Sequence, residues 1–87
     1  MGVEARTERF VYIIRSLADP DRHYVGLTSD VASRLVAHNN GHSPQTARHS
    51  PWRLVVCLGF ANDKGAADFE KYLKSSAGRT LIRQHFV

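Results

Sequence analysis

The spacing of apolar and polar residues changes along the chain, and each period predicts an element. Residues 9–15, Arg-Phe-Val-Tyr-Ile-Ile-Arg, are rich in aromatic and β-branched side chains and predict a strand. The turn residues Asp-Pro-Asp at 19–21 follow, and His-Tyr-Val-Gly at 23–26 predicts a second strand that returns beside the first as a hairpin. Residues 52–60, Trp-Arg-Leu-Val-Val-Cys-Leu-Gly-Phe, predict a third strand.

The first predicted helix spans residues 31–38. Thr-Ser-Asp at 28–30 supplies capping oxygens, and Val31, Leu35 and Val36 then recur at helical spacing. Asn-Gly at 40–41 ends this helix with residues that tolerate a left-handed conformation. The polar segment 42–51 that follows has no period and predicts an exposed loop near the functional face.

A second helix is predicted from residue 64 to about 76. Asn62 and Asp63 can cap it, and Gly78 is the expected stop signal. A short final helix is predicted for residues 79–86.

The predicted element order is β-β-α-β-α-α. A three-stranded amphipathic sheet needs helices to cover a face, so we expect an α/β (α+β) fold with a small antiparallel sheet flanked by helices. At 87 residues the chain has room for one hydrophobic core and for no second domain. We therefore expect a flexible N-terminus over residues 1–8 and a single domain over residues 9–87.

Composition restricts the class of protein. The chain is 43% hydrophobic and 23% charged, as ordinary globular domains are. No apolar run approaches the roughly 18 residues that a membrane span requires. The N-terminus carries charges where a signal peptide needs an apolar stretch. These features predict a cytoplasmic protein without membrane contact.

Charge and cysteine content add two expectations. The formal net charge of +4 favours polyanionic partners, because Lys and Arg near phosphates gain Coulomb energy and release counterions. Cys57 is the single cysteine and lies in the apolar run 54–58. We therefore expect it to be a small buried side chain without a disulfide.

One carboxylate lies on the apolar side of the second predicted helix. Ala66, Phe69, Leu73 and Ala77 recur at spacings of three and four, and Glu70 falls on the same stripe. A buried carboxylate is costly unless it is paired, hydrogen-bonded or bound to a metal. Glu70 is therefore either half of a salt bridge with an arginine at the core edge or a metal ligand.

Arg34 and His38 are four residues apart on the first predicted helix, so both project from one face. Arginine offers a permanently charged planar fork that suits phosphate, and histidine exchanges a proton near neutral pH. The pair fits a phosphate-binding face, and it also fits a solvated helix edge.

Tyr12 and Tyr24 fall on the two strands of the predicted hairpin. As core aromatics, their hydroxyls need only a hydrogen-bond partner; as functional residues, both hydroxyls must reach a common site. Gly26 favours the second interpretation, because a glycine that ends a strand lets backbone or ligand approach closely.

Other common chemistries lose support. The remaining histidines show no close paired spacing of a zinc site, and one cysteine cannot complete a structural cluster. The chain also lacks a phosphate-binding loop of the Walker type, a dinucleotide-binding GxGxxG sequence and a GxSxG nucleophile elbow.

Taken in order, these residues resemble the GIY-YIG nuclease family, whose two named motifs lie on adjacent strands of a small sheet. The motif residues are Val11-Tyr12-Ile13, Tyr24-Val25-Gly26, Arg34, His38 and Glu70. The resemblance covers almost the whole chain from Phe10 onward. It is strongest to small stand-alone bacterial members, and the chain is also similar to the N-terminal nuclease domain of the excinuclease ABC nuclease component. The stretches Tyr-Val-Gly-Leu-Thr-Ser-Asp, His-Asn-Asn-Gly and Ser-Pro-Trp-Arg-Leu-Val strengthen it.

The match has departures. Val11 replaces a leading glycine, depending on how the first motif is registered, and Val25 replaces isoleucine in the second motif. Leu27 stands where some members carry a lysine that helps to activate a tyrosine. Residues 78–85 lack the asparagine that many members place after the glutamate. These departures bear on catalytic efficiency rather than on the fold.

The resemblance implies a metal-dependent endonuclease that hydrolyses DNA phosphodiester bonds, is structure-specific and serves DNA repair or recombination. Glu70 would hold Mg²⁺ or Mn²⁺, and Arg34 would neutralise charge on the phosphoryl oxygens. Tyr12 or Tyr24, assisted by His38, would orient or deprotonate the attacking water. Further DNA contacts are expected from Gly26, Asn39, Arg48 and Arg53.

Two rival interpretations stay open from the sequence. One is a catalytically inactive nucleic-acid-binding module of the same fold, and the other is a small interaction domain. The joint presence of Tyr12, Tyr24, Arg34 and Glu70 favours the enzyme. Since the nuclease fold uses the whole chain, substrate specificity is left to a protein partner or to DNA shape. The sequence fixes neither the oligomeric state nor the choice between DNA and RNA.

Overall fold

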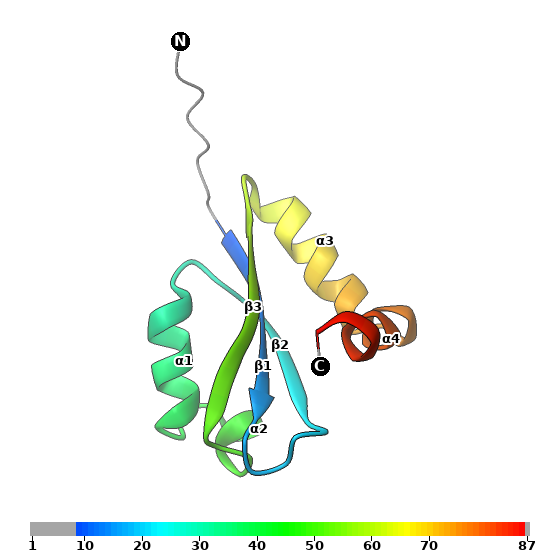
Figure 1. The fold of residues 1–87 in the computed structure, drawn as a ribbon. Helices are drawn as coiled ribbons and strands as arrows, with labels where there is room; N and C mark the ends of the chain where they lie inside the picture. The colour runs from blue at the N-terminus through cyan, green and yellow to red at the C-terminus, as the bar shows by residue number, and fades with distance from the viewer. Residues whose placement is uncertain (1–8, 87) are drawn as a thin grey trace.

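The computed structural model describes residues 9–86, which form three strands and four helices (Figure 1). The strands are β1 (Arg9–Ser16), β2 (His23–Thr28) and β3 (Trp52–Phe60). The helices are α1 (Val31–Asn39), α2 (Pro44–Ala47), α3 (Asp63–Leu73) and α4 (Ser76–His85). The expected three-stranded antiparallel sheet flanked by helices is confirmed. The flexible N-terminus predicted for residues 1–8 lies outside the described residues.

Strand β1 is the centre of the sheet, whose strand order is β2-β1-β3. Successive side chains of a strand point to opposite faces of the sheet. Four consecutive residues of β1, Val11 to Ile14, are nevertheless all buried. Such an unbroken buried run requires cover on both faces of the sheet.

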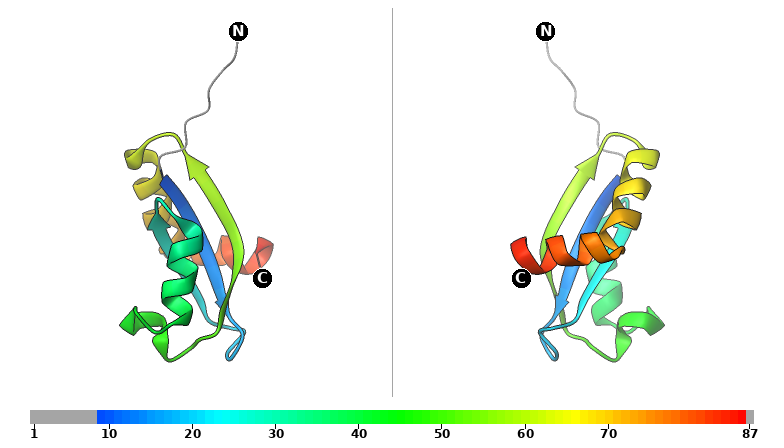
Figure 2. Two further views of the ribbon diagram at one scale, coloured as in Figure 1. Left: turned by 90° about the vertical axis from the view of Figure 1, so that its left-hand side faces the viewer. Right: turned by 90° about the vertical axis from the view of Figure 1, so that its right-hand side faces the viewer.

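Helices supply that cover, so the molecule has three layers. Figure 2 shows α1 on one side of the sheet, and α3 and α4 on the other. The core under α3 and α4 consists of Val11, Ile13, Val25, Ala66, Leu73 and Ile82. The core on the α1 side consists of Tyr12, Ile14 and Trp52, with Tyr24, Val31 and Leu35 packed against it. The candidate tyrosines thus belong to the α1 side of the sheet.

The boundary between the last two helices differs from the prediction. Helix α3 ends at Leu73, because Ser75 caps a new helix by accepting a hydrogen bond from the Gly78 backbone N–H at 3.2 Å. Gly78 therefore does not stop a helix but lies buried in the first turn of α4. A Cβ on Gly78 would lie 2.1 Å from the Tyr72 carbonyl oxygen, so only glycine allows this approach. Ala77 belongs to α4 and not to the stripe of the preceding helix.

The segment predicted as an exposed loop contains α2, which Pro44 begins at a position that suits proline. Its residue Thr46 is 1% exposed, so the segment is partly internal. Two apolar residues are also more exposed than predicted. Val36 is 58% exposed on α1, and Cys57 is exposed on the edge strand β3. An apolar run alone does not distinguish a covered strand position from an uncovered one. None of the helices within residues 9–86 is long and apolar enough to cross a membrane.

Candidate active site

Tyr12 lies at the centre of the candidate site. Its side chain is 1% exposed, and its hydroxyl oxygen lies 2.8 Å from Nε2 of His38 on α1. Gly26 of β2 pairs directly with Tyr12, and a Cβ there would lie 2.3 Å from the Tyr12 hydroxyl oxygen. The space that we expected a ligand to occupy is therefore filled by the Tyr12 ring. Contact of Gly26 with substrate stays a prediction.

His38 is fully buried between Tyr12 and Thr46, whose Oγ1 lies 2.7 Å from His38 Nδ1. The Thr46 hydroxyl donates to the Ser43 carbonyl oxygen at 3.4 Å, so it accepts from His38 Nδ1–H. Burial and then the positive charge of Arg34 lower the pKa of His38, which keeps the ring neutral near pH 7. We therefore assign Nε2 as the acceptor for the Tyr12 hydroxyl proton.

Thr46 was not among the residues predicted from the sequence. Its signal was the Ser-Pro pair at 43–44, which marks a helix start with serine at the N-cap and proline in the first turn. That short helix turns Thr46 inward, where its hydroxyl fixes the tautomer of His38.

Helix α3 brings a second set of polar groups to the site along the β2 edge. The ring of Tyr24 lies with its centroid 6.4 Å from that of Tyr12 and 5.0 Å from that of His38. Nζ of Lys74 lies 5.8 Å from the Tyr24 ring centroid and 3.1 Å from Glu70 Oε2. The side chain of Glu70 is 23% exposed. The salt bridge expected for Glu70 exists, with Lys74 directly after its own helix instead of an arginine.

Electrostatic coupling shows which charges face the Tyr12 hydroxyl. Burial raises the pKa of Tyr12 above its usual value, the Arg34 guanidinium lowers it, and the negative charges of Tyr24 and Glu70 raise it. The net direction is upward, so Tyr12 keeps its proton in the resting protein. The structure thus brings together the five side chains predicted to be catalytic: Tyr12, Tyr24, Arg34, His38 and Glu70.

The residues predicted to contact DNA lie in different surroundings. The Asn39 amide donates to the Trp52 carbonyl oxygen at 3.1 Å and accepts from the Trp52 N–H at 2.6 Å. Asn39 therefore ties the end of α1 to the start of β3. Arg48, directly after α2, and Arg53, on β3, are both exposed. As substrate contacts, all three residues stay predictions.

Glu70 is the carboxylate of this cluster that can bind a metal ion. Within residues 9–86, no three or more His, Cys, Asp or Glu side chains lie together in a way that could hold one. Mg²⁺ keeps several waters and uses one or two carboxylates with substrate phosphates. A donor set of one carboxylate therefore fits a hard cation completed by water and phosphate, and it does not fit a structural zinc ion.

Known proteins share this sequence and fold. The family model described as the GIY-YIG catalytic domain matches residues 8–83. The structure-specific endonuclease subunit SLX1 of Malassezia globosa is 38% identical over 91 aligned positions, which cover 95% of this chain and 20% of that protein. The corresponding slx1 subunit of Talaromyces marneffei is 37% identical over 65 residues, covering 68% of this chain and 17% of that protein. The chain therefore matches only a small part of these longer relatives.

Shorter bacterial proteins are similar over more of their length. A UPF0213 protein of Streptococcus pneumoniae is 36% identical over 53 residues, covering 60% of this chain and 54% of that protein. The solution NMR structure of a UPF0213 protein from Bacillus halodurans superposes with a TM-score of 0.54 at 28% identity, covering 90% of this chain and 85% of that chain. Since the family model spans both tyrosine motifs and Glu70, this chain belongs to the GIY-YIG family.

Proposed function

We propose that this chain is a metal-dependent endonuclease that hydrolyses phosphodiester bonds of DNA. The observation that carries the proposal is the buried hydrogen-bonded chain from Tyr12 through His38 to Thr46, close to Arg34 and Glu70. Family membership and the printed names of the SLX1 relatives support it independently.

In this proposal, Tyr12 and His38 act together as the general base. The raised pKa of Tyr12 makes a free tyrosinate a poor resting species. The Tyr12 hydroxyl can still take a proton from the attacking water if it passes its own proton to His38 Nε2 at the same time. The lowered pKa of His38 keeps Nε2 open to receive that proton, and Thr46 holds the ring in the required tautomer.

Arg34 and Glu70 would handle the phosphate charge. Arg34 is exposed, permanently charged and close to Tyr12, so it can neutralise charge that develops on the phosphoryl oxygens. Glu70 is the residue that would hold a divalent cation, which supplies Lewis-acid stabilisation to the phosphate when bound. Lys74 pairs with Glu70 and keeps this carboxylate beside Tyr24. The choice of Mg²⁺ or Mn²⁺ and the cytoplasmic location are parts of this proposal.

The substrate proposal is branched, flapped or otherwise structured DNA of the kind that arises in repair and recombination. The SLX1 relatives are named structure-specific endonuclease subunits. We propose that this chain likewise recognises DNA shape, and that a protein partner sharpens its specificity.

The test compares the chain with its Glu70→Gln variant on labelled duplex, single-stranded, flap and branched DNA, with Mg²⁺, Mn²⁺ or EDTA. We expect cleavage that requires metal and falls at least about 100-fold in Glu70→Gln, the order of effect of a lost transition-state contact. Asp68→Asn is the matched control, because Asp68 is an exposed carboxylate on the same helix, paired with Lys64.

Full metal-dependent cleavage by Glu70→Gln would refute the assignment of Glu70. Salt-sensitive DNA binding without cleavage by the unaltered chain would favour the inactive binding module.

A further inference from the structure

A cavity of about 700 Å³ lies next to the candidate active site, where the β1–β2 turn and the start of β2 face the end of α3 and helix α4. It is large enough for a nucleotide unit. Tyr24 and Lys74, which flank the catalytic cluster, also line this cavity. The cavity and the candidate active site therefore share a wall.

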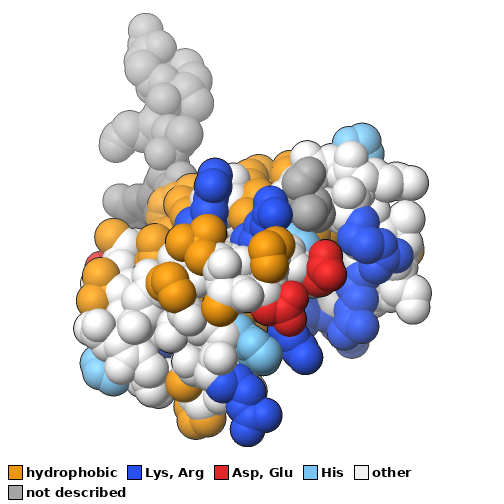
Figure 3. Space-filling model, turned by 60° about the horizontal axis from the view of Figure 1, so that its bottom comes forward, with side chains coloured by type: hydrophobic (Ala, Val, Ile, Leu, Met, Phe, Trp, Pro, Cys, Tyr) orange, Lys and Arg blue, Asp and Glu red, His pale blue; other side chains and the backbone are white. Residues whose placement is uncertain are grey.

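The lining of the cavity is mainly cationic. Its four cations are Arg22, Lys74, Arg79 and Arg83, and its two carboxylates are Asp19 and Asp21. Figure 3 shows Lys and Arg side chains gathered beside acidic ones on this end of the molecule.

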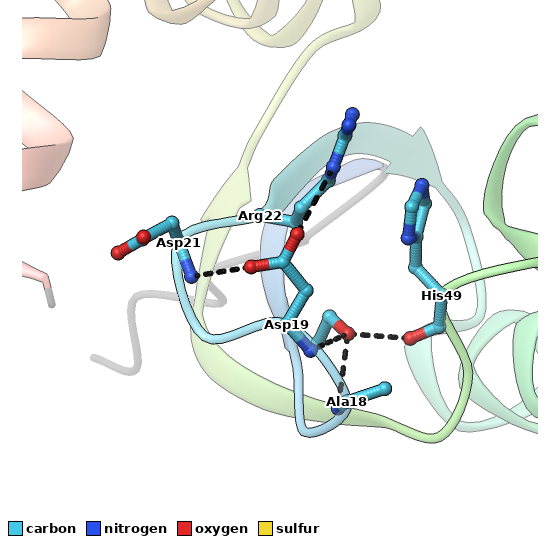
Figure 4. A network of polar contacts seen from close by, with 6 residues as sticks. Ala18, Asp19, Asp21, Arg22 and His49 are labelled. Carbon is cyan, nitrogen blue, oxygen red and sulfur yellow. Dashed lines mark hydrogen bonds and ion pairs between the residues drawn. The ribbon is translucent and has the colours of Figure 1, made fainter.

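The two carboxylates leave most of this positive charge uncompensated. Figure 4 shows that Asp19 bonds the Arg22 side chain only through Nε, at 3.4 Å, while the carboxylate of Asp21 turns away from both. Within residues 9–86, neither Arg79 nor Arg83 takes part in an ion pair. Two guanidinium groups of α4 are thus available to an anion.

An unpartnered buried atom also points to a ligand. Nε2 of His23, another lining residue, is buried and has no hydrogen-bond partner in the described part of the chain. Native structures rarely leave a buried polar atom unpaired. A phosphate oxygen in the cavity would give this nitrogen an acceptor and would bind both arginines in the geometry that guanidinium favours.

We propose that this cavity binds a backbone phosphate of the substrate strand, close to the scissile phosphate. The inference rests on the proposed function, because it places the same DNA strand across both sites. Phosphates of one strand follow one another about every 3.4 Å along the duplex axis, so a neighbouring phosphate can reach a cavity that begins at Tyr24. The cavity would hold the strand while Tyr12, Arg34 and Glu70 act on the scissile bond.

The test measures DNA binding by the full chain and by the double variant Arg79→Gln/Arg83→Gln. Binding is measured in EDTA, so the strand stays intact, and cleavage kinetics are measured separately with metal. We expect the slope of log binding constant against log salt to fall by about 0.9 on duplex DNA, the loss of one phosphate contact. We also expect KM to rise while kcat is retained, because the lost contact is made before and during the reaction alike.

The control is Lys64→Gln, which removes an exposed cation at the start of α3, far along the helix from α4. Both arginines are exposed, and a thermal unfolding midpoint verifies that the double variant stays folded. If the unaltered chain cleaves DNA and the double variant keeps its salt slope and KM, the cavity assignment is refuted while the nuclease proposal stands. If the unaltered chain neither binds nor cleaves DNA, both proposals fail.

A second pair of substrates identifies the source of the phosphate. The same strand is tested with and without a terminal 5′-phosphate. A backbone phosphate predicts the same change in slope for both strands. A change confined to the phosphorylated strand would assign the cavity to a strand end and overturn the backbone assignment.

Discussion

At the scale of single residues, Gly26 shows how a missing side chain positions a reactive group. The Tyr12 ring passes over Gly26 toward His38, and any Cβ at this position would overlap the ring and its hydroxyl. The sequence indicated that a close approach requires glycine here. It could not show that the approaching group comes from the neighbouring strand.

We predict that Gly26→Ala moves the Tyr12 hydroxyl away from His38. The added Cβ would lie 2.3 Å from Tyr12 Oη, and the ring is enclosed by buried neighbours. The free energy of unfolding should fall by about 1–3 kcal/mol, the usual effect of overpacking, and cleavage should fall with it. Urea denaturation and cleavage rates provide the measurement.

The matched control is Gly65→Ala, whose added carbon would lie 3.2 Å from its nearest atom, Asn62 Oδ1. It should change stability by less than Gly26→Ala and should leave cleavage intact. A Gly26→Ala variant with unchanged cleavage would mean that the Tyr12–His38 hydrogen bond is dispensable.

At the scale of elements, the junction of α3 and α4 was predicted wrongly, and the reason is general. Glycine after a helical stretch commonly marks a helix end. Here Gly78 instead allows the first turn of α4 to touch the last turn of α3. Local sequence contains the cap at Ser75, but it does not reveal which glycine is needed for tertiary contact.

We predict that Gly78→Ala is strongly destabilising. Its Cβ would lie 2.1 Å from the Tyr72 carbonyl oxygen and 2.4 Å from Leu73 Cα, and these backbone atoms cannot rotate away. The loss should reach about 3 kcal/mol, the upper part of the overpacking range. The exposed neighbour Ala77 is the control: Ala77→Ser should stay within about 0.5 kcal/mol. Equal urea midpoints for Gly78→Ala and the unaltered chain would show that α4 can shift at no cost.

At the scale of the whole molecule, the three layers explain how the site is assembled. His38 reaches Tyr12 from the α1 layer, whereas Glu70 and Lys74 come from α3 and its C-cap on the other side of the sheet. The two layers meet at β2, which is an edge strand and lets groups from both sides reach one site.

We predict that the free energy of unfolding falls as pH drops below about 6.5, the usual histidine value. Burial, more than nearby positive charge, lowers the pKa of His38 and of His23, so the unfolded chain binds more protons in this range. Their contribution is therefore present above the unfolded pKa and is lost as pH falls toward the folded one. The groups facing His38 are Arg34, Tyr12 and Tyr24.

Urea denaturation at a series of pH values checks this prediction. The variant His38→Gln should show a shallower decline than the unaltered chain, because one of the two contributing histidines is gone. An unchanged pH dependence in His38→Gln would show that burial of this ring does not affect its protonation.

The sequence by itself determined the three strands, the first helix, the helix caps and the five residues of the candidate site. Capping and periodicity act between residues close in the chain, and the motif residues were recognised by their order. The tertiary structure alone decided that Thr46 orients His38, that Lys74 pairs with Glu70 and that a cationic cavity adjoins Tyr24. It also decided that Cys57 is exposed and that Gly78 lies inside a helix. These features depend on how separate elements pack, and no local pattern fixes the distances between them.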